Sequence, residues 1–225
     1  MTDPRRPYRN QVVYDTKTAM TAHPEAPQLY LASASPRRRQ LLDQIGVRYR
    51  ILPVEIDETP LAGEPPRVYA VRMALSKARA AGRPPGGPPV LAADTVVTLD
   101  GDILGQPAGR EEALAMLARL SGRTHRVITA VGVVDDRGEA VEAVTSRVTF
   151  RSVARDEAEA YWAGGEPAGK AGGYAIQGYA AVFVARLEGS YSGVVGLPLF
   201  ETARLLRARG VTAPPPAVAQ ARRAP

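Results

Sequence analysis

The sequence predicts a mixed α/β fold in which helices flank a β-sheet. A short apolar run at residues 29–32 reads as a buried strand, and a helix follows it directly from residue 36. A second helix, at residues 66–81, precedes a long apolar strand at 90–99. Two further strands then form a hairpin over residues 126–150. Strands that alternate with helices before an antiparallel hairpin are typical of a mixed sheet with helices packed on it.

The chain has 225 residues, which suits one domain or two closely joined lobes with a substantial core. Residues 1–27 are polar, with scattered prolines and no hydrophobic periodicity, so we expect a disordered N-terminal tail there. Proline and alanine dominate residues 211–225, where we expect a second disordered tail. The folded domain is therefore predicted at residues 28–210. Met20 lies just before the first strand, so we expect translation to start either there or at Met1.

The composition narrows the classes of function. The chain has no cysteine, which excludes disulfides, cysteine-ligated zinc and thiol catalysis. It has no run of about 18 apolar residues and no apolar segment near its N-terminus, so we expect neither a membrane span nor a secretory signal. These features favour a cytoplasmic protein. The net charge of +6 suggests an anionic partner, although arginines in both tails contribute to it.

The first helix carries an unusual cluster of cations. Ser35 stands at its N-cap position and Pro36 at its first helical position. Residues 37–39, all arginine, follow in the first turn, where the helix already presents free amides and partial positive charge. The cluster is either a phosphate cradle or a solvated basic turn. The hydroxyls of Ser33 and Ser35 favour the cradle, because they can also hold phosphate oxygens.

The next elements carry an acidic loop and a single lysine. A strand-like segment at residues 49–54 leads into the loop at 55–59, which is either a divalent-cation site or simply solvated. Lys77 lies beside the apolar stripe of the helix at 66–81. Its ammonium group either extends to the surface or reaches into a cleft, where it could bind phosphate.

Asp94 interrupts the apolar strand at residues 90–99. A carboxylate inside a buried strand is costly unless it is paired, hydrogen-bonded or bound to a metal. It is either a structural aspartate that accepts backbone N–H groups or a functional one. Function is favoured, since the residues around it in the sequence offer few charges to pair with it. Asp100 and Gly101 then predict a hairpin turn.

The remaining predicted elements are helices at residues 111–120, 155–163 and 199–207, and a strand at 180–187 that follows a glycine-rich loop at 170–178. Gln177 in that loop carries a donor and an acceptor side by side, which suits the edge of a nucleobase. His125 begins a strand and is expected to be structural rather than catalytic.

Taken together, these motifs resemble the Maf family of nucleoside triphosphate pyrophosphatases. The matching segments occur in the order of that family and span residues 29–209. They are Ser33-Ala34-Ser35-Pro36-Arg37-Arg38, Asp57-Glu58, Lys77-Ala78, Ala93-Asp94-Thr95, Leu120-Ser121-Gly122, Lys170-Ala171-Gly172, Ile176-Gln177-Gly178 and Val195-Gly196-Leu197-Pro198.

The resemblance implies two lobes around a deep cleft and the hydrolysis of a nucleoside triphosphate to the monophosphate and pyrophosphate. It makes Asp94 the catalytic carboxylate and proton acceptor. It makes Ser33, Arg38 and Lys77 phosphate-binding residues. It also implies a divalent cation, Mg²⁺ or Mn²⁺, held by Glu58 and Asp94. The resemblance allows a homodimer but does not determine the oligomeric state.

The resemblance also implies a base preference. Family members that act on 7-methyl-GTP tend to have Trp, Gln and Glu where this chain has Arg37, Thr95 and Gln177. These three residues are typical of the group that acts on dTTP and UTP, or on modified pyrimidine triphosphates. A glutamine can accept from the N3–H of uracil or thymine and donate to a neighbouring carbonyl. One departure is Gln106, where the family commonly has a lysine.

Two alternative functions follow from the same residues. The first is a non-enzymatic module that binds nucleic acid through its basic surface. The few aromatic residues are not interleaved with the arginines, so no stacking platform is visible and no nucleic-acid partner is expected. The second is a pyrophosphatase that acts on non-standard purine triphosphates.

Overall fold

The computed structural model describes residues 26–212. Nearly all of the two predicted tails, and Met20 with them, lie outside these residues. Packing continues to the end of the described part, slightly past the predicted domain boundary. The side chain of Val211 is buried, and the backbone carbonyl of Thr212 accepts a hydrogen bond of 3.1 Å from Gln28 Nε2.

A seven-stranded mixed sheet forms the centre of the molecule. Its strands are β1 (Leu29–Leu31), β2 (Tyr49–Ile51), β3 (Val90–Leu99), β4 (Asp102–Leu104), β5 (Thr124–Asp135), β6 (Gly138–Phe150) and β7 (Val184–Glu188). The order across the sheet is β2-β1-β3-β5-β6-β7, and β4 pairs with β3 as a hairpin. Strand β1 runs parallel to both of its neighbours, and every other pairing is antiparallel. The predicted mixed α/β fold is confirmed.

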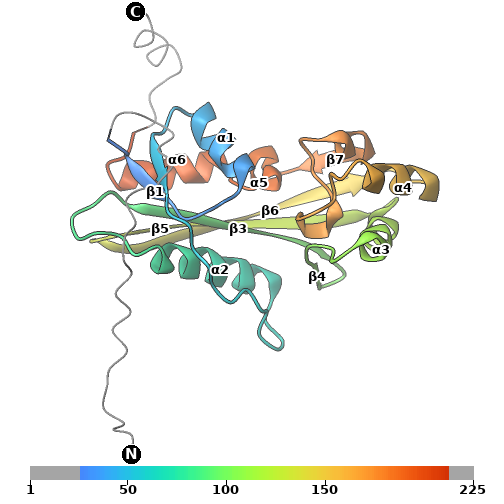
Figure 1. Ribbon diagram of the computed structural model, residues 1–225, viewed down its shortest axis with the longest axis horizontal. Coiled ribbons are helices and arrows are strands. Elements are labelled where there is room, and N and C mark those ends of the chain that lie inside the picture. Colours follow the sequence, from blue (N-terminus) through green and yellow to red (C-terminus); the bar gives the residue numbers. More distant parts are fainter. Residues whose placement is uncertain (1–25, 213–225) are drawn as a thin grey trace, which may run out of the picture.

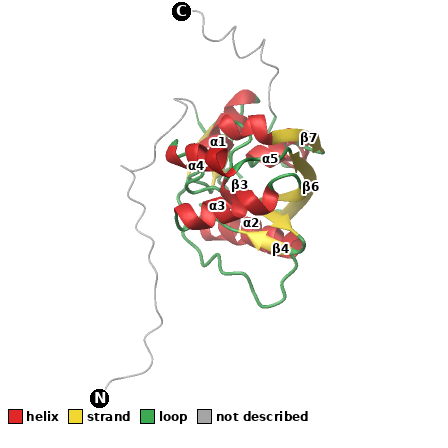
Figure 2. Ribbon diagram, turned by 90° about the vertical axis from the view of Figure 1, so that its right-hand side faces the viewer, coloured by secondary structure: helices red, strands yellow, loops and turns green. Residues whose placement is uncertain are grey.

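Helices cover both faces of this sheet. They are α1 (Pro36–Gln44), α2 (Pro66–Ala80), α3 (Arg110–Leu120), α4 (Arg155–Ala163), α5 (Tyr191–Val195) and α6 (Leu199–Ala208), with short 3₁₀ turns η1 (Ala171–Gly173) and η2 (Tyr179–Phe183). Figure 2 views the molecule from the end where α3 and α4 lie, with α1 above the sheet and α2 below it. Because both of its faces are covered, β3 is buried along nearly its whole length and reads as a continuous apolar run.

Most predicted elements are confirmed, and the differences occur where short segments curl. The strand expected at residues 180–187 begins only at Val184, because the preceding residues form η2. There the backbone N–H groups of Tyr179 and Ala180 donate to the Glu166 carboxylate instead of to a neighbouring strand. The segment at 49–54 pairs with β1 only as far as Ile51.

The long strands β5 and β6 join the two ends of the molecule (Figure 1). Helices α1, α2 and α6 lie toward one end, and α3 and α4 pack together at the other. The largest buried apolar cluster extends through both ends, from Leu29 and Leu42 to Leu117 and Phe150. No helix within residues 26–212 is long and apolar enough to cross a membrane.

Candidate active site

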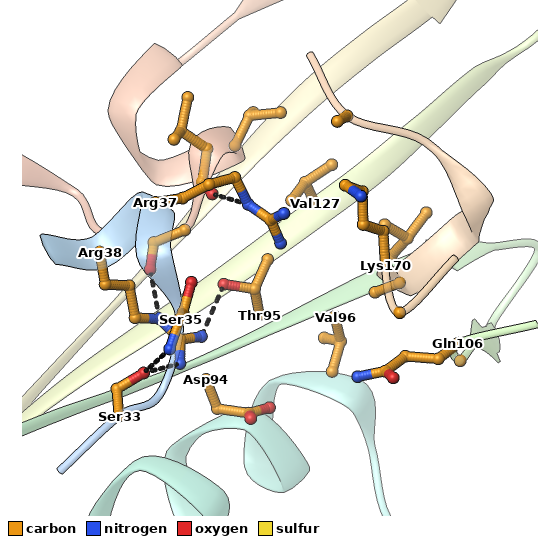
Figure 3. A pocket seen from close by; sticks show the side chains of 18 of the residues that line it. Ser33, Ser35, Arg37, Arg38, Asp94, Thr95, Val96, Gln106, Val127 and Lys170 are labelled. Carbon is orange, nitrogen blue, oxygen red and sulfur yellow. Dashed lines mark hydrogen bonds between the residues drawn. The ribbon is translucent and has the colours of Figure 1, made fainter. Parts of the chain in front are cut away.

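A cavity of about 650 Å³ opens between the two ends, above the middle of β3 (Figure 3). Every site residue expected from the sequence lines it: Ser33, Arg37, Arg38, Glu58, Lys77, Asp94, Thr95 and Gln177. The β1–α1 turn and the start of α1 supply the first three, the loop before α2 supplies Glu58, α2 and β3 supply the next three, and the glycine-rich loop supplies the last. The predicted cleft is therefore present, and its walls come from segments spread over most of the domain.

The β1–α1 turn presents two of its three arginines to the cavity. Ser35 is the N-cap residue of α1, and Pro36 begins the helix, as expected. Arg37 and Arg38 line the cavity, whereas Arg39 does not. The first turn of α1 contains no acidic residue. The cations and the free amides of the helix end therefore accumulate positive charge at one wall.

Arg38 is fixed on three sides by hydrogen bonds. Its Nε donates to the carbonyl oxygen of Gly196 at 3.0 Å, and its Nη1 donates to Ser33 Oγ at 3.1 Å. Its Nη2 lies 3.4 Å from Thr95 Oγ1. Burial lowers the pKa of Arg38, and the negative charge of Asp94 offsets part of that shift. A guanidinium group desolvated in this way is well prepared to receive an anionic ligand.

Arg37 is tethered only by its inner nitrogen. Its Nε donates to the carbonyl oxygen of Val195 at 3.3 Å. Its two terminal nitrogens have no hydrogen-bond acceptor among residues 26–212, and Figure 3 shows them pointing into the cavity. Ser33 adds a further donor, because its Oγ already accepts bonds from Arg38 Nη1 and from the Ser35 amide. The hydroxyl proton of Ser33 is therefore free for a ligand.

The carboxylate of Asp94 is paired with Lys77, which the sequence interpretation did not foresee. Lys77 Nζ donates to Asp94 Oδ1 at 2.7 Å and lies 3.0 Å from Glu58 Oε1. The side chains of Lys77 and Asp94 are only 12% and 8% exposed, whereas that of Glu58 is 53% exposed. Of the two readings of Lys77, the structure shows the one in which its ammonium reaches into the cleft.

Glu58 and Asp94 form the acidic side of the cavity. Both approach the same ammonium group, so the two carboxylates converge. Within residues 26–212 there is no group of three or more acidic, histidine or cysteine side chains that could hold a metal ion. A pair of carboxylates fits Mg²⁺ or Mn²⁺, since such ions usually take one or two carboxylates and complete their shell with phosphates and water.

A chain of hydroxyl groups extends from Arg38 into the sheet. Thr129 Oγ1, buried on β5, lies 2.7 Å from the carbonyl oxygen of Gly193 and 3.0 Å from Thr95 Oγ1. A carbonyl can only accept, so the single hydroxyl proton of Thr129 goes to Gly193, and Thr95 donates its own proton to Thr129. Thr95 is then an acceptor for Arg38. Thr95 therefore orients Arg38. No pattern in the sequence pointed to Thr129.

The far wall of the cavity is formed by the glycine-rich loop. Gln177 is exposed there. Lys170 adds a cation, and its ammonium donates to the backbone carbonyl oxygens of Glu166 and Ala168. Burial lowers the pKa of Lys170, and the charge of Arg37 adds to the effect. In Figure 3, Lys170 and Gln106 lie on the same side of the cavity.

Comparison with known proteins identifies the family. A model of the family described as Maf-like protein matches residues 28–209. The chain belongs to the Maf family. The dTTP/UTP pyrophosphatase of Alkalilimnicola ehrlichii is 58% identical over 186 residues, which cover 80% of this chain and 92% of the relative. That of Burkholderia thailandensis is 54% identical over 206 residues, which cover 85% and 97%.

Among solved structures, the Ham1 protein of Staphylococcus aureus is similar with a TM-score of 0.38 and 15% identity, over 54% of this chain and 71% of that one. A similarity this low supports no conclusion about the fold or the function of this protein.

For this Maf protein, the geometry clarifies the departure at Gln106. The side chain of Gln106 lines the cavity where the family commonly has a lysine. Lys170 lies on the same wall and keeps a cation there. The sequence interpretation assigned no role to Lys170.

Proposed function

We propose that this Maf protein hydrolyses dTTP and UTP, or modified pyrimidine triphosphates, to the monophosphate and pyrophosphate. The observation that carries the proposal is one cavity in which two guanidinium groups share a space with a buried, lysine-paired aspartate and the exposed amide of Gln177. The names of relatives more than 50% identical over most of their length support it.

The triphosphate would lie against the β1–α1 turn. Arg37 offers its two terminal nitrogens, Ser33 its hydroxyl proton, and Arg38 a buried positive charge. Hydrogen bonds between cationic donors and phosphate oxygens are shorter and stronger than neutral ones. Lys77 would contact a phosphate oxygen while it keeps Asp94 in place.

Asp94 would act as the general base. Its Oδ1 accepts the bond from Lys77, and its other carboxylate oxygen is available to a water molecule in the cavity. The water oxygen attacks the α-phosphorus and gives its proton to Asp94. The bond from the α-phosphorus to the bridging oxygen breaks, and its electron pair leaves with pyrophosphate. Arg37 and Arg38 then stabilise the charge that develops on the phosphate oxygens.

A divalent cation, Mg²⁺ or Mn²⁺, would be held by Glu58 and Asp94, whose carboxylates converge at the acidic side of the cavity. When bound, it would neutralise charge on the phosphate oxygens.

The base would lie at the far wall, where Gln177 reads its edge. The amide oxygen of Gln177 can accept from the N3–H of thymine or uracil, and its nitrogen can donate to a ring carbonyl. A site whose polar groups are left unpaired by the wrong base rejects that base strongly. Arg37 and Thr95 would contribute through the position of the triphosphate, since Thr95 acts on Arg38.

A substrate panel tests the proposal. The purified full-length chain is incubated with dTTP, UTP, CTP, GTP and ITP in Mg²⁺ or Mn²⁺, and phosphate is measured after inorganic pyrophosphatase is added. We expect the highest kcat/KM for dTTP and UTP, with phosphate release that depends on the added pyrophosphatase. A preference for ITP would favour the purine enzyme instead, and no turnover at all would favour the binding module. The cytoplasmic location expected from the sequence stays a prediction.

A further inference from the structure

Gln177 depends on its backbone for its position. Its side chain is exposed in the cavity and makes no hydrogen bond with any other residue of the described part of the chain. A side chain without such a bond points where the main chain directs it. Whatever holds the backbone of residues 175–180 therefore determines where the amide group of Gln177 can meet a base.

The carboxylate of Glu166 holds this segment on the C-terminal side of Gln177. Its Oε2 accepts the backbone N–H of Tyr179 at 2.8 Å, and its Oε1 accepts that of Ala180 at 3.3 Å. Both donors are at the start of η2 (Tyr179–Phe183), so the carboxylate anchors the first residues of that turn. Glu166 itself lies in the loop after α4, eleven residues before Gln177 in the printed sequence.

Tyr161 holds the segment on the N-terminal side of Gln177. Its hydroxyl group accepts the backbone N–H of Ala175 at 3.2 Å and donates to Glu166 Oε1 at 2.7 Å. Its ring is buried on α4 against Phe183, with 5.2 Å between the ring centroids. One carboxylate and one hydroxyl group thus bracket Gln177 from both directions.

Gly178 makes the room that this arrangement needs. Its φ of −113° is accessible to any residue, so no conformational rule requires glycine there. A Cβ at this position, however, would lie 2.2 Å from the Glu166 carboxyl group. The missing side chain of Gly178 therefore leaves the space that the half-buried Glu166 carboxylate occupies.

All the hydrogen-bonding partners of the Glu166 side chain are donors, so both of its terminal atoms must be acceptors. The donors from Tyr161, Tyr179 and Ala180 all point at its two oxygens. Burial acts to raise the pKa of Glu166, but the hydrogen bonds outweigh it and hold that pKa below its usual value. A glutamine would turn an NH₂ group toward at least one donor and lose that bond.

We propose that Glu166, together with Tyr161, is a positioning residue that places Gln177 for recognition of the pyrimidine base. Neither residue touches the reacting phosphate. The inference rests on the proposed function, because it assumes that Gln177 reads the base.

The test compares Glu166→Gln and Tyr161→Phe with Gln177→Ala as the reference and Glu157→Gln as the matched control. Glu157 is on the same helix as Tyr161 but pairs with Arg151, away from the cavity. For Glu166→Gln and Tyr161→Phe we expect KM for dTTP to rise roughly 10-fold with kcat changed less than about 2-fold, because a hydrogen bond that holds the segment around Gln177 is lost and the phosphate site is intact. The ratio of kcat/KM for dTTP to that for dGTP should fall about as far as it does in Gln177→Ala.

The results distinguish a failure of this inference from a failure of the proposed function. An unchanged ratio in both Glu166→Gln and Tyr161→Phe, with a lowered ratio in Gln177→Ala, overturns this inference alone. An unchanged ratio in Gln177→Ala, or a wild-type chain without activity on dTTP and UTP, overturns the proposed function instead. If Glu166→Gln does not fold, Tyr161→Phe decides, since it keeps the buried ring and removes only the hydroxyl group. Gly178→Ala should imitate Glu166→Gln, because its Cβ displaces the carboxylate.

Discussion

The pairing of Asp94 with Lys77 decides what each residue can do. A buried carboxylate without a partner would favour its neutral form, and a neutral acid cannot accept a proton. The ammonium of Lys77 at 2.7 Å keeps a positive charge beside it. Removing either partner of such a pair leaves the other charge buried and uncompensated, which typically costs about 3–5 kcal/mol.

Asp94→Asn tests the general base. The amide has the same shape and still accepts the bond from Lys77, but it cannot take a proton from water. We expect kcat for dTTP to fall by roughly 10²–10⁴-fold, the usual contribution of a general base. Asp102→Asn is the control, since Asp102 pairs with Arg119 outside the cavity. If Asp94→Asn kept more than about 10% of kcat, Asp94 would not be the base.

Thr129→Val tests the hydroxyl chain behind Arg38. The valine has nearly the same shape but leaves Thr95 without its acceptor and Gly193 without its donor. We expect KM for dTTP to rise roughly 5- to 10-fold, in line with the loss of a buried hydrogen bond. Thr129→Ser keeps the hydroxyl group and should behave like the wild type. Equal KM values for the valine and serine variants would show that these hydroxyl groups have no part in substrate binding.

At the scale of elements, two helices far apart in the sequence hold the phosphate side of the site together. The arginines of α1 donate to the carbonyl oxygens of Val195 and Gly196, at the end of α5. Helix α5 has only five residues and ends at Gly196, whose φ is +133°. Its N-cap residue, Ser190, accepts a hydrogen bond from the backbone N–H of Gly193. The acceptors that fix both guanidinium groups therefore depend on one tight turn.

Gly196→Ala tests that turn. A Cβ would meet only ordinary contacts there, at 3.7 Å or more, so the cost comes from the left-handed backbone. We expect a loss of stability of about 1 kcal/mol or more, with a clear rise in KM as the carbonyl of Gly196 leaves Arg38. Gly210→Ala is the control, because Gly210 has φ +77° and open space around it, far from the cavity. It should lose stability but keep KM.

The long periodic elements were predictable from the sequence, and the short ones were not. The strand β3 and the helix α2 were expected within a residue of their observed bounds, because ten or more residues carry a clear pattern. Helix α5 and the turn η2 have only five residues each, which is too short for a periodic pattern to repeat. Helix α5 has a local N-cap at Ser190, whereas η2 is anchored by Glu166, a contact that only the folded chain provides.

The same reasoning applies to the site. The cavity residues were foreseen one by one, from a resemblance to ordered family motifs. The Lys77–Asp94 pair was not, because it depends on how α2 packs on β3, and no pattern within either segment reports that register. Thr129 and Glu166 were also missed. Each acts through contacts with residues distant in the sequence, and no pattern around either residue reports those contacts.

At the scale of the whole molecule, His125 ties the stability of the core to pH. It is buried against Phe150 and Tyr174, and its Nε2 lies 2.8 Å from the Tyr174 hydroxyl oxygen. Its Nδ1 has no hydrogen-bond partner within residues 26–212. Burial lowers the pKa of His125 to about 4, whereas an unfolded histidine titrates near 6.5. The expected structural role of this residue agrees with its place in the aromatic core.

Acid should therefore destabilise the fold over a defined range. Above about pH 6.5 the histidine is neutral in both states and contributes no pH dependence. As the pH falls from 6.5 toward 4, His125 becomes protonated in the unfolded chain but stays neutral in the folded chain. The free energy of unfolding therefore declines by up to about 3 kcal/mol. Urea unfolding at several pH values measures this decline. A double variant, His125→Phe with Tyr174→Phe, should show a shallower decline, and identical slopes would contradict the assignment.

The hydrogen bonds from the α1 arginines to the end of α5 also have a consequence for biosynthesis. Val195 and Gly196, which receive the two guanidinium groups, leave the ribosome long after Arg37, Arg38 and Asp94 have emerged. A nascent chain that contains only β1, α1 and β3 therefore still lacks the acceptors that fix both guanidinium groups. We expect the growing polypeptide to leave the nucleotide pool of the cell untouched until its last quarter is made, and prematurely terminated products to be inert.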